Sequence, residues 1–566
     1  MSDVLRHGRS RRDFLGGLVL GGGALAMVGS GCTNEEPPAT AVGTSALDAT
    51  QFGARGDGIT DDTDAIQAAL DQAARGPYGG TVYLPAGIYL VSNSLIVGSR
   101  TRVVGDGPGI TVLRGHAGSY QGKWVNGNAV TATVACVAAN HTLIENLTVD
   151  HATNGTWANG IVFLPDGMNG SGVVCSDCTV RGCEVLGFDR HEYLIWTLRS
   201  RHMKVLDNRL DGFVIDFTQR SNQEGIEAFG GYDVLIRGNQ ISRIGNAGIN
   251  AGAAMGVANA AVGGIRIVEN HIEVSRVGIH LGTAFDSTNG PQNITGALVM
   301  GNTVTGSYEQ GIFLETPISG TTLTNILIVE NVITDADTGV TLYGIQGETS
   351  HHGVVLRDNV IEGARSTTIG AVSAFYMSNM VIAGNVISNS ASVALWLIGS
   401  SCVHVSGNVV DGVESEAILA DSCDMLDVAA NHFRNYARNG QTAGVLITSS
   451  AKTVFRNNTL AQDGIGTDVI VSGDEAVVAC NVARTGAAVP FLNLGSNPNY
   501  GTIAMVSGAD TVDIANALVN DGSHFNVTQM TGAPTAFRIE RIAGGFRIRI
   551  AVAATGDETF RWEISQ

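Results

Sequence analysis

Apolar and polar residues alternate along most of the chain between residues 47 and 485, in short runs separated by Gly, Asn and Asp. This alternation, with a period of two, is typical of β-strands, because successive strand side chains point to opposite faces. Residues 61–74 differ: acidic residues and Thr63 open an amphipathic pattern that predicts a helix. The pattern therefore predicts many short strands and one helix near their start.

One short pattern recurs through these strands: apolar, any, apolar, two residues, Asn, any, apolar. Residues 234–241 and 326–333 are examples. The spacing of the Asn varies from 23 to 32 residues, which indicates one supersecondary unit per repeat. The repeated Asn lies at 208, 239, 270, 302, 331, 359, 385, 408, 431, 458 and 481.

A second strand follows each Asn turn as a Gly-apolar-any triplet, for example at residues 225–227, 248–250 and 278–280. No single repeat can bury its apolar face alone, so the repeats must stack as coils, about 4.8 Å apart. Identical Asn side chains at the inner turn then form a hydrogen-bonded ladder. The sequence predicts an all-β, right-handed parallel β-helix whose first coil is covered by the helix at 61–74.

The two ends of the chain are expected to lie outside the β-helix. Ser10 to Leu15 resembles a twin-arginine export signal, and the apolar stretch after it ends at Cys32, where a lipoprotein signal would be cleaved. We therefore expect a signal at 1–32, a linker at 33–46, the β-helix at 47–485 and a small β-sandwich at 495–566. This organisation predicts an exported protein, either a cell-surface lipoprotein anchored through Cys32 or a secreted one.

The net charge and the cysteine content argue against two kinds of binding, to nucleic acid and to zinc. The net charge of −19 excludes the electrostatic footprint of a nucleic-acid-binding protein. The pair Cys175 and Cys178 has no second pair at matching spacing, which argues against a zinc site. Cys402 and Cys423 occupy similar places in successive repeats, as a disulfide or as stacked free thiols.

Residues 52–67, followed by 80–89, resemble the opening of the pectate-lyase superfamily. Residues 187–192 and 210–217 are similar to the catalytic module of calcium-dependent mannuronan C5-epimerases, a likeness that covers roughly residues 50–220. The resemblance implies a polysaccharide substrate, Ca²⁺ as a cofactor, and functional roles for Asp189, His191 and Asp216.

Charged residues gather in the same stretch, although only 15% of the chain is charged. We expect His191 to remove a proton next to a uronate carboxylate, with the other groups neutralising the developing charge. The predicted catalytic residues are His191, Asp216, Asp189 and Glu227. The predicted substrate-binding residues are Arg190, Glu192, Arg220, Glu224 and His280.

Two other functions stay open. The segment 222–227 resembles a motif of polygalacturonase-type hydrolases, and a glycoside hydrolase could use Asp189, Asp216 and Glu227 as its carboxyl groups. The third function is a non-catalytic β-helix that binds glycan or forms a surface scaffold.

Overall fold

The structure is a computed structural model of the chain. The predicted signal with Cys32, and the linker up to residue 45, lie outside the residues that it describes. The described residues are 46–116, 123–125, 128–151, 159–167, 172–187, 193–214, 221–253, 261–283, 293–316, 319–348, 351–439, 443–461, 467–471, 477–479, 481–483, 491–493, 500–504, 511–515, 524–531, 537–542, 545–550 and 559–565.

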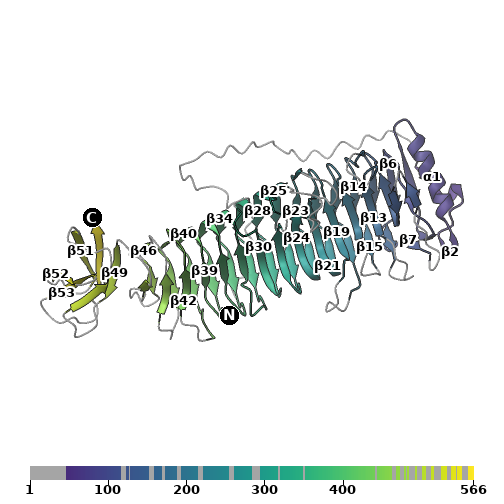
Figure 1. The fold of residues 1–566 in the computed structure, drawn as a ribbon. Helices are drawn as coiled ribbons and strands as arrows, with labels where there is room; N and C mark the ends of the chain where they lie inside the picture. The colour runs from purple at the N-terminus through teal and green to yellow at the C-terminus, as the bar shows by residue number, and fades with distance from the viewer. Residues whose placement is uncertain are drawn as a thin grey trace, which may run out of the picture. The chain divides into compact units, whose positions relative to one another are not determined.

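The chain winds into stacked coils, and a typical coil has three short strands, Lys204–Leu206 (β17), Arg209–Asp211 (β18) and Glu224–Phe229 (β19). Each strand pairs in parallel with its counterparts in the coils before and after it, which gives three strand columns (Figure 1). In the next coil, Leu235–Arg237 (β20) continues the first column, and the long strand Gln240–Ala253 (β21) serves both others. The predicted parallel β-helix is confirmed.

The third column carries the site described below. Its strands are Leu95–Ile96 (β5), Ala132–Val137 (β10), Asn159–Leu164 (β13), Tyr193–Leu198 (β16), β19, β21, His271–Thr283 (β24), Gln310–Glu315 (β27), Thr338–Tyr343 (β30), Val372–Phe375 (β33), Leu395–Ile398 (β36), Ile418–Asp421 (β39), Ala443–Thr448 (β42), Thr467–Val471 (β45) and Phe491–Asn493 (β48). The last strand, β48, extends the column beyond the expected boundary at residue 485.

The asparagine ladder forms as predicted. The Nδ2 group of each Asn donates to Oδ1 of the next at 2.9–3.1 Å, without a break from Asn208 to Asn481. Each Oδ1 also accepts the backbone N–H of the preceding Asn. The ladder therefore satisfies the buried polar groups of the turn and joins the coils along the axis.

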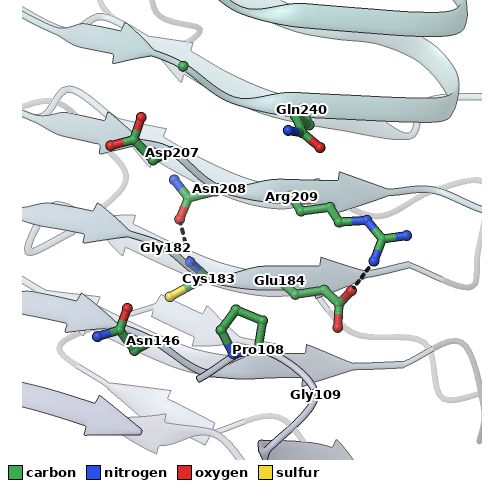
Figure 2. Close-up of a pocket in the computed structure, with 11 residues that line it drawn as sticks. Pro108, Gly109, Asn146, Gly182, Cys183, Glu184, Asp207, Asn208, Arg209 and Gln240 are labelled. Carbon is green, nitrogen blue, oxygen red and sulfur yellow. Dashed lines mark hydrogen bonds and ion pairs between the residues drawn. The ribbon is translucent and has the colours of Figure 1, made fainter. Parts of the chain in front are cut away.

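The first rung of the ladder borders a surface depression of about 790 Å³ (Figure 2). There the backbone N–H of Cys183 donates to Asn208 Oδ1 at 2.9 Å, and Arg209 pairs with Glu184 at 2.6 Å. Glu224, Glu227 and His280, the predicted site residues that the structure describes, do not line this depression.

A left-handed turn residue precedes each ladder Asn from Asn208 to Asn458. Several coils have Gly at this position, but the turn before Asn431 uses Ala430, with φ 58°. An L-residue in this conformation costs about 1–2 kcal/mol, and Gly avoids that cost.

We expect Ala430→Gly to stabilise the protein by about 0.5–1 kcal/mol in equilibrium denaturation, after the added entropy of unfolded Gly is subtracted. Ala429→Gly is the matched control. Ala429 ends the strand Asp424–Ala429 (β40), where Gly should destabilise by about 0.5–1 kcal/mol. Equal losses for the two variants would show that the turn is not strained.

One continuous apolar core runs inside the coils from Ala49 to Val471. The single described α-helix, Thr63–Arg75 (α1), adds Ile66 and Leu70 to that core, which confirms the predicted cap. Within the described part of the chain, no helix has the length and apolar character needed to cross a lipid bilayer.

The C-terminal residues form two three-stranded antiparallel sheets. One contains Tyr500–Ala504 (β49), Thr559–Ser565 (β54) and His524–Thr531 (β51), and the other Thr511–Ala515 (β50), Gly545–Ile550 (β53) and Phe537–Ile542 (β52). Phe560 from the first sheet and Phe546 from the second share one apolar cluster. The two sheets therefore pack on each other, as in a small sandwich.

The described cysteines are all free thiols. Cys402 and Cys423 are not bridged, and the Cys402 Sγ lies 3.9 Å from the sulfur of Met425. Burial raises the pKa of the Cys183 thiol to about 12, so this group stays protonated and unreactive.

Candidate active site

The third column presents two rows of side chains away from the apolar core, because alternate residues of each strand point outward. We call them the first outer row and the second outer row. The first contains Trp196, Glu227, Asn250, His280, Phe313, Thr341, Ser373 and Trp396, in successive coils. The second contains Leu198, Phe229, Gly252, Gly282, Glu315, Tyr343, Phe375 and Ile398.

Three of the predicted site residues lie together in this column. Glu224 and Glu227 are on β19, and His280 is two coils beyond Glu227 in the first outer row. The others, Asp189, Arg190, His191, Glu192, Asp216 and Arg220, lie outside the described residues. Leu186, at the end of Glu184–Leu186 (β15), pairs with Asp211, so the two Gly-Phe segments that follow begin on adjacent coils.

The Glu224 carboxylate is held in place by three N–H donors. Its Oε1 accepts from Asn246 Nδ2 at 2.7 Å and from Asn250 Nδ2 at 3.1 Å, and its Oε2 accepts from the backbone N–H of Ala247 at 2.9 Å. Burial nevertheless raises the pKa of Glu224 to about 8, because the donors only partly offset the loss of water. The bonds therefore orient this carboxyl group without keeping it strongly acidic.

Glu227 is the more strongly perturbed member of the pair. Burial, with only 6% of the residue exposed, raises its pKa well above the ordinary range, and the charge of Glu224 raises it further. The indole N–H of Trp196 acts in the opposite direction. Since two neighbouring carboxylates cannot both ionise cheaply, Glu227 holds a proton at neutral pH.

A polar relay connects this acid pair to the next coils. Asn250 donates to Glu224 through Nδ2, and its Oδ1 lies 2.9 Å from His280 Nδ1. On the other side of the imidazole, Nε2 lies 3.1 Å from Glu315 Oε1, although the two are not aligned as a hydrogen bond. Two carboxyl groups therefore bracket an amide and an imidazole, all of them largely buried.

Two aromatic side chains, those of Tyr193 and Trp196, lie next to the pair on the preceding coil. Tyr193, on β16, pairs with Glu224, and its ring centroid lies 4.9 Å from that of Trp196. Burial raises the pKa of the Tyr193 phenol, and the charges of Glu227 and Glu224 raise it further. The phenol is therefore a neutral proton donor or acceptor beside two carboxyl groups.

Sequence reasoning identified Glu227 and His280 but missed three groups around them, Asn246, Asn250 and Tyr193. The triplets at 225–227, 248–250 and 278–280 already aligned Glu227, Asn250 and His280 in one column. Asn250 could have been found from that alignment, whereas Asn246 lies at a register shift inside β21 and has no repeated pattern.

The pair makes stability depend on pH. Its pKa values are raised above the ordinary glutamate value of 4.5, so the folded protein binds more protons than the unfolded chain. This contribution is fully present below 4.5 and is lost as the pH rises through about 8.

We therefore expect Glu227→Gln to raise the thermal unfolding midpoint at pH about 8 and to change it much less at pH about 5. Thermal melts across this range test the expectation. Glu145→Gln gives a contrasting control, because paired arginines hold the pKa of Glu145 below its ordinary value despite burial. The same change at both pH values would mean that Glu227 is ionised in the folded protein.

Among the described residues, Glu224 and Glu227 are poor ligands for the expected Ca²⁺. Both Glu224 oxygens already accept hydrogen bonds, and a protonated Glu227 is a poor cation ligand. No group of three His, Cys, Asp or Glu among the described residues could hold a metal ion.

Two family models match the chain. Residues 46–280 match "Rhamnogalacturonase A/epimerase, pectate lyase-like", and residues 318–483 match "Right handed beta helix region". The first match contains the acid pair and His280, and the second confirms the predicted handedness. The predicted resemblance to pectate-lyase-like β-helix proteins is confirmed.

Curated relatives match a smaller part. Mannuronan C5-epimerase AlgE2 of Azotobacter vinelandii is 39% identical over 184 residues, 29% of this chain and 17% of that protein. Alginate lyase 7 of the same organism is 39% identical over 183 residues, 29% of this chain and 20% of that protein. The chain thus spans a fifth or less of the length of these relatives.

Among solved structures, a tailspike protein of E. coli bacteriophage HK620 in complex with a pentasaccharide has a TM-score of 0.50 at 12% identity. The similarity covers 92% of this chain and 94% of the tailspike chain. At this identity the likeness supports the fold alone.

Proposed function

We propose that this chain is a polysaccharide-modifying enzyme that transfers protons on a uronate-containing glycan, as lyases and C5-epimerases do, with Glu227 as a neutral acid in the site. One observation carries the proposal. A buried pair of interacting carboxyl groups lies on one outward-facing strand, within the segment that matches an epimerase and pectate-lyase-like family model. Perturbed carboxyl groups are characteristic of acid–base sites.

The chemistry uses the proton on Glu227. Removal of the proton next to a uronate carboxylate places negative charge on that carboxylate, and the charge must be stabilised in the transition state. A carboxylic acid that stays neutral at pH 7 can donate a hydrogen bond to this charge, as in ketosteroid isomerase. Glu227 is such an acid.

The remaining roles follow from position. His191 as the base that removes the proton stays a prediction, together with the functional roles of Asp189 and Asp216. Among the described residues, Tyr193 and His280 flank the acid pair and are the proton-transfer groups nearest to it along the column. The substrate is a glycan related to alginate, as the names of the matching relatives suggest.

A second function shares the same acid. In glycoside hydrolysis, a protonated carboxyl group donates to the glycosidic oxygen while a second carboxylate assists the attack on the sugar. Glu227 supplies the protonated group, and Glu224 supplies the second carboxylate where it is ionised, above a pH of about 8.

A product screen separates the functions. The full chain is incubated with mannuronan, polygalacturonate and a neutral glucan. A lyase generates ultraviolet-absorbing unsaturated uronates, a hydrolase generates reducing ends without that absorbance, and an epimerase changes the uronate configuration seen by NMR without cleavage.

We expect uronate products from the first two substrates and their loss in a His191→Ala, Asp216→Ala double variant. Equal conversion by wild type and double variant would contradict the predicted base. Binding without any conversion would support the non-catalytic alternative instead.

A further inference from the structure

Beyond the acid pair, one aromatic ring lies on each of five successive coils. We call these rings the aromatic strip: His280, Phe313, Tyr343, Phe375 and Trp396. The His280 and Phe313 rings stack with centroids 5.3 Å apart. The Tyr343 and Phe375 centroids are 5.8 Å apart, and those of Phe375 and Trp396 are 5.6 Å apart. The strip thus follows the helix axis.

The strip does not belong to the core. Its residues occupy the two outer rows, while the core on these coils is formed by their neighbours, such as Ile312 and Leu342. Tyr343 is 45% exposed, and Phe313, Phe375 and Trp396 are partly exposed. Since exposed aromatic rings in a row gain little for folding, such a patch on a surface indicates a binding site.

Small residues lie beside the rings in the two outer rows. Thr341 and Ser373 occupy the first outer row beside Tyr343 and Phe375. Closer to the acid pair, Gly252 and Gly282 leave the second outer row without side chains on two successive coils. A Cβ at Gly252 would lie 1.7 Å from the backbone oxygen of Gly282, so a side chain is excluded there.

We propose that the aromatic strip binds the non-reacting part of a linear polysaccharide, which lies parallel to the helix axis with its sugar rings stacked on successive coils. The inference rests on the proposed function, because the strip continues the same outer rows that carry Glu227. The coil spacing of about 4.8 Å is close to the length of one pyranose unit. Trp396 is six coils beyond Glu227, roughly 29 Å along the axis.

The chemistry of the strip favours stacking over ion pairing. Aromatic rings bind the apolar C–H faces of sugars, and this contact loses little strength in salt. The charged residues of the two outer rows along and just beyond the strip, Glu315 and Asp421, are acidic and would repel uronate carboxylates rather than pair with them. The strip therefore contacts ring faces, and the binding that it contributes should depend weakly on ionic strength.

The test measures binding by calorimetry in the Glu227→Gln protein, so that turnover does not interfere. The probes are a mannuronate trisaccharide and a mannuronate octasaccharide, the second long enough to reach the strip. We expect the octasaccharide to bind more tightly, and Trp396→Ala and Phe375→Ala each to weaken it by about 3- to 10-fold. The trisaccharide affinity should change less than 2-fold, which is roughly the limit of such a comparison.

Tyr232→Ala is the matched control, since Tyr232 is 57% exposed but joins the first column rather than the third. It should leave both affinities unchanged. Trp396→Leu keeps an apolar side chain and separates loss of stacking from a folding defect, which circular dichroism also monitors.

Equal affinities of parent and strip variants for the octasaccharide, or no gain from trisaccharide to octasaccharide, would overturn the proposal. The two hypotheses fail separately. Full turnover by Glu227→Gln contradicts the proposed function alone, whereas length-independent binding contradicts the aromatic strip alone.

Discussion

Replacement of Glu227 by Gln should lower turnover on a uronate glycan by about 10²- to 10⁴-fold, the usual contribution of a positioned acid. Gln keeps the size of the side chain. Its amide protons are much less acidic than the carboxyl proton, so they form a weaker hydrogen bond to the developing negative charge. The variant should fold, because it removes one of two buried carboxyl groups that oppose each other's ionisation. Initial rates of product formation at saturating substrate provide the measurement.

Two further variants sharpen this result. Glu184→Gln, on a strand of the second column, should retain full turnover. Glu224→Gln removes a charge that raises the pKa of Glu227, so the upper limb of the pH–rate profile should move to lower pH. Wild-type turnover in Glu227→Gln, or a profile that does not move in Glu224→Gln, would show that the pair has no catalytic role.

The second large effect is expected in the asparagine ladder. Asn331 donates to Asn359 Oδ1 and to the backbone oxygen of Val299, and its own Oδ1 accepts two N–H bonds from Asn302. Asn331→Ala leaves these groups buried and without partners, where each costs about 1–3 kcal/mol. We expect a loss of about 3 kcal/mol or more in the free energy of unfolding, measured by chemical denaturation.

Asn293→Ala is the control for this prediction. Asn293 is exposed on Asn293–Met300 (β25), and its Oδ1 accepts one bond from the Thr322 hydroxyl. Its removal should cost less than about 0.5 kcal/mol. A similar small loss for Asn331→Ala would mean that the ladder contributes no more than a surface contact.

The ladder also shows why the fold was predictable. Asn208 and Asn481 are separated by many coils, yet the apolar residues around each Asn follow one pattern. Few independent structural features have to be predicted in a repeat architecture, because every coil has the same inner turn and the same stacked neighbours. The expected helix, strands and ladder were therefore confirmed together.

The candidate site was predictable only in part, because only some of its residues follow the repeat. Glu227 and His280 sit in triplets that align by themselves, so their shared column could be read directly. Glu224 was expected to bind substrate, but its protonation depends on Asn246 and Asn250, which are brought in from the next coil. The triplet alignment already places Asn250 in this column, whereas the contact of Asn246 has no signature in a single sequence.

The aromatic strip was hidden for a different reason. His280, Phe313 and Trp396 lie in one outer row, whereas Tyr343 and Phe375 lie in the other. A search along either row alone finds aromatic residues with gaps. The continuous strip is recognised only in the three-dimensional structure, where the two outer rows lie side by side on the stacked coils.

The ladder has one more consequence, which concerns modular construction. Because each ladder Asn offers the same donor and acceptor to its neighbours, removal of one whole coil should preserve the hydrogen bonds of the ladder. Deleting the 23 residues that start at Asn408 would bring Gly407 directly before Asn431, and Asn385 would then hydrogen-bond to Asn431 in place of Asn408. The length of the β-helix would then be variable without any change in the residues of the candidate active site.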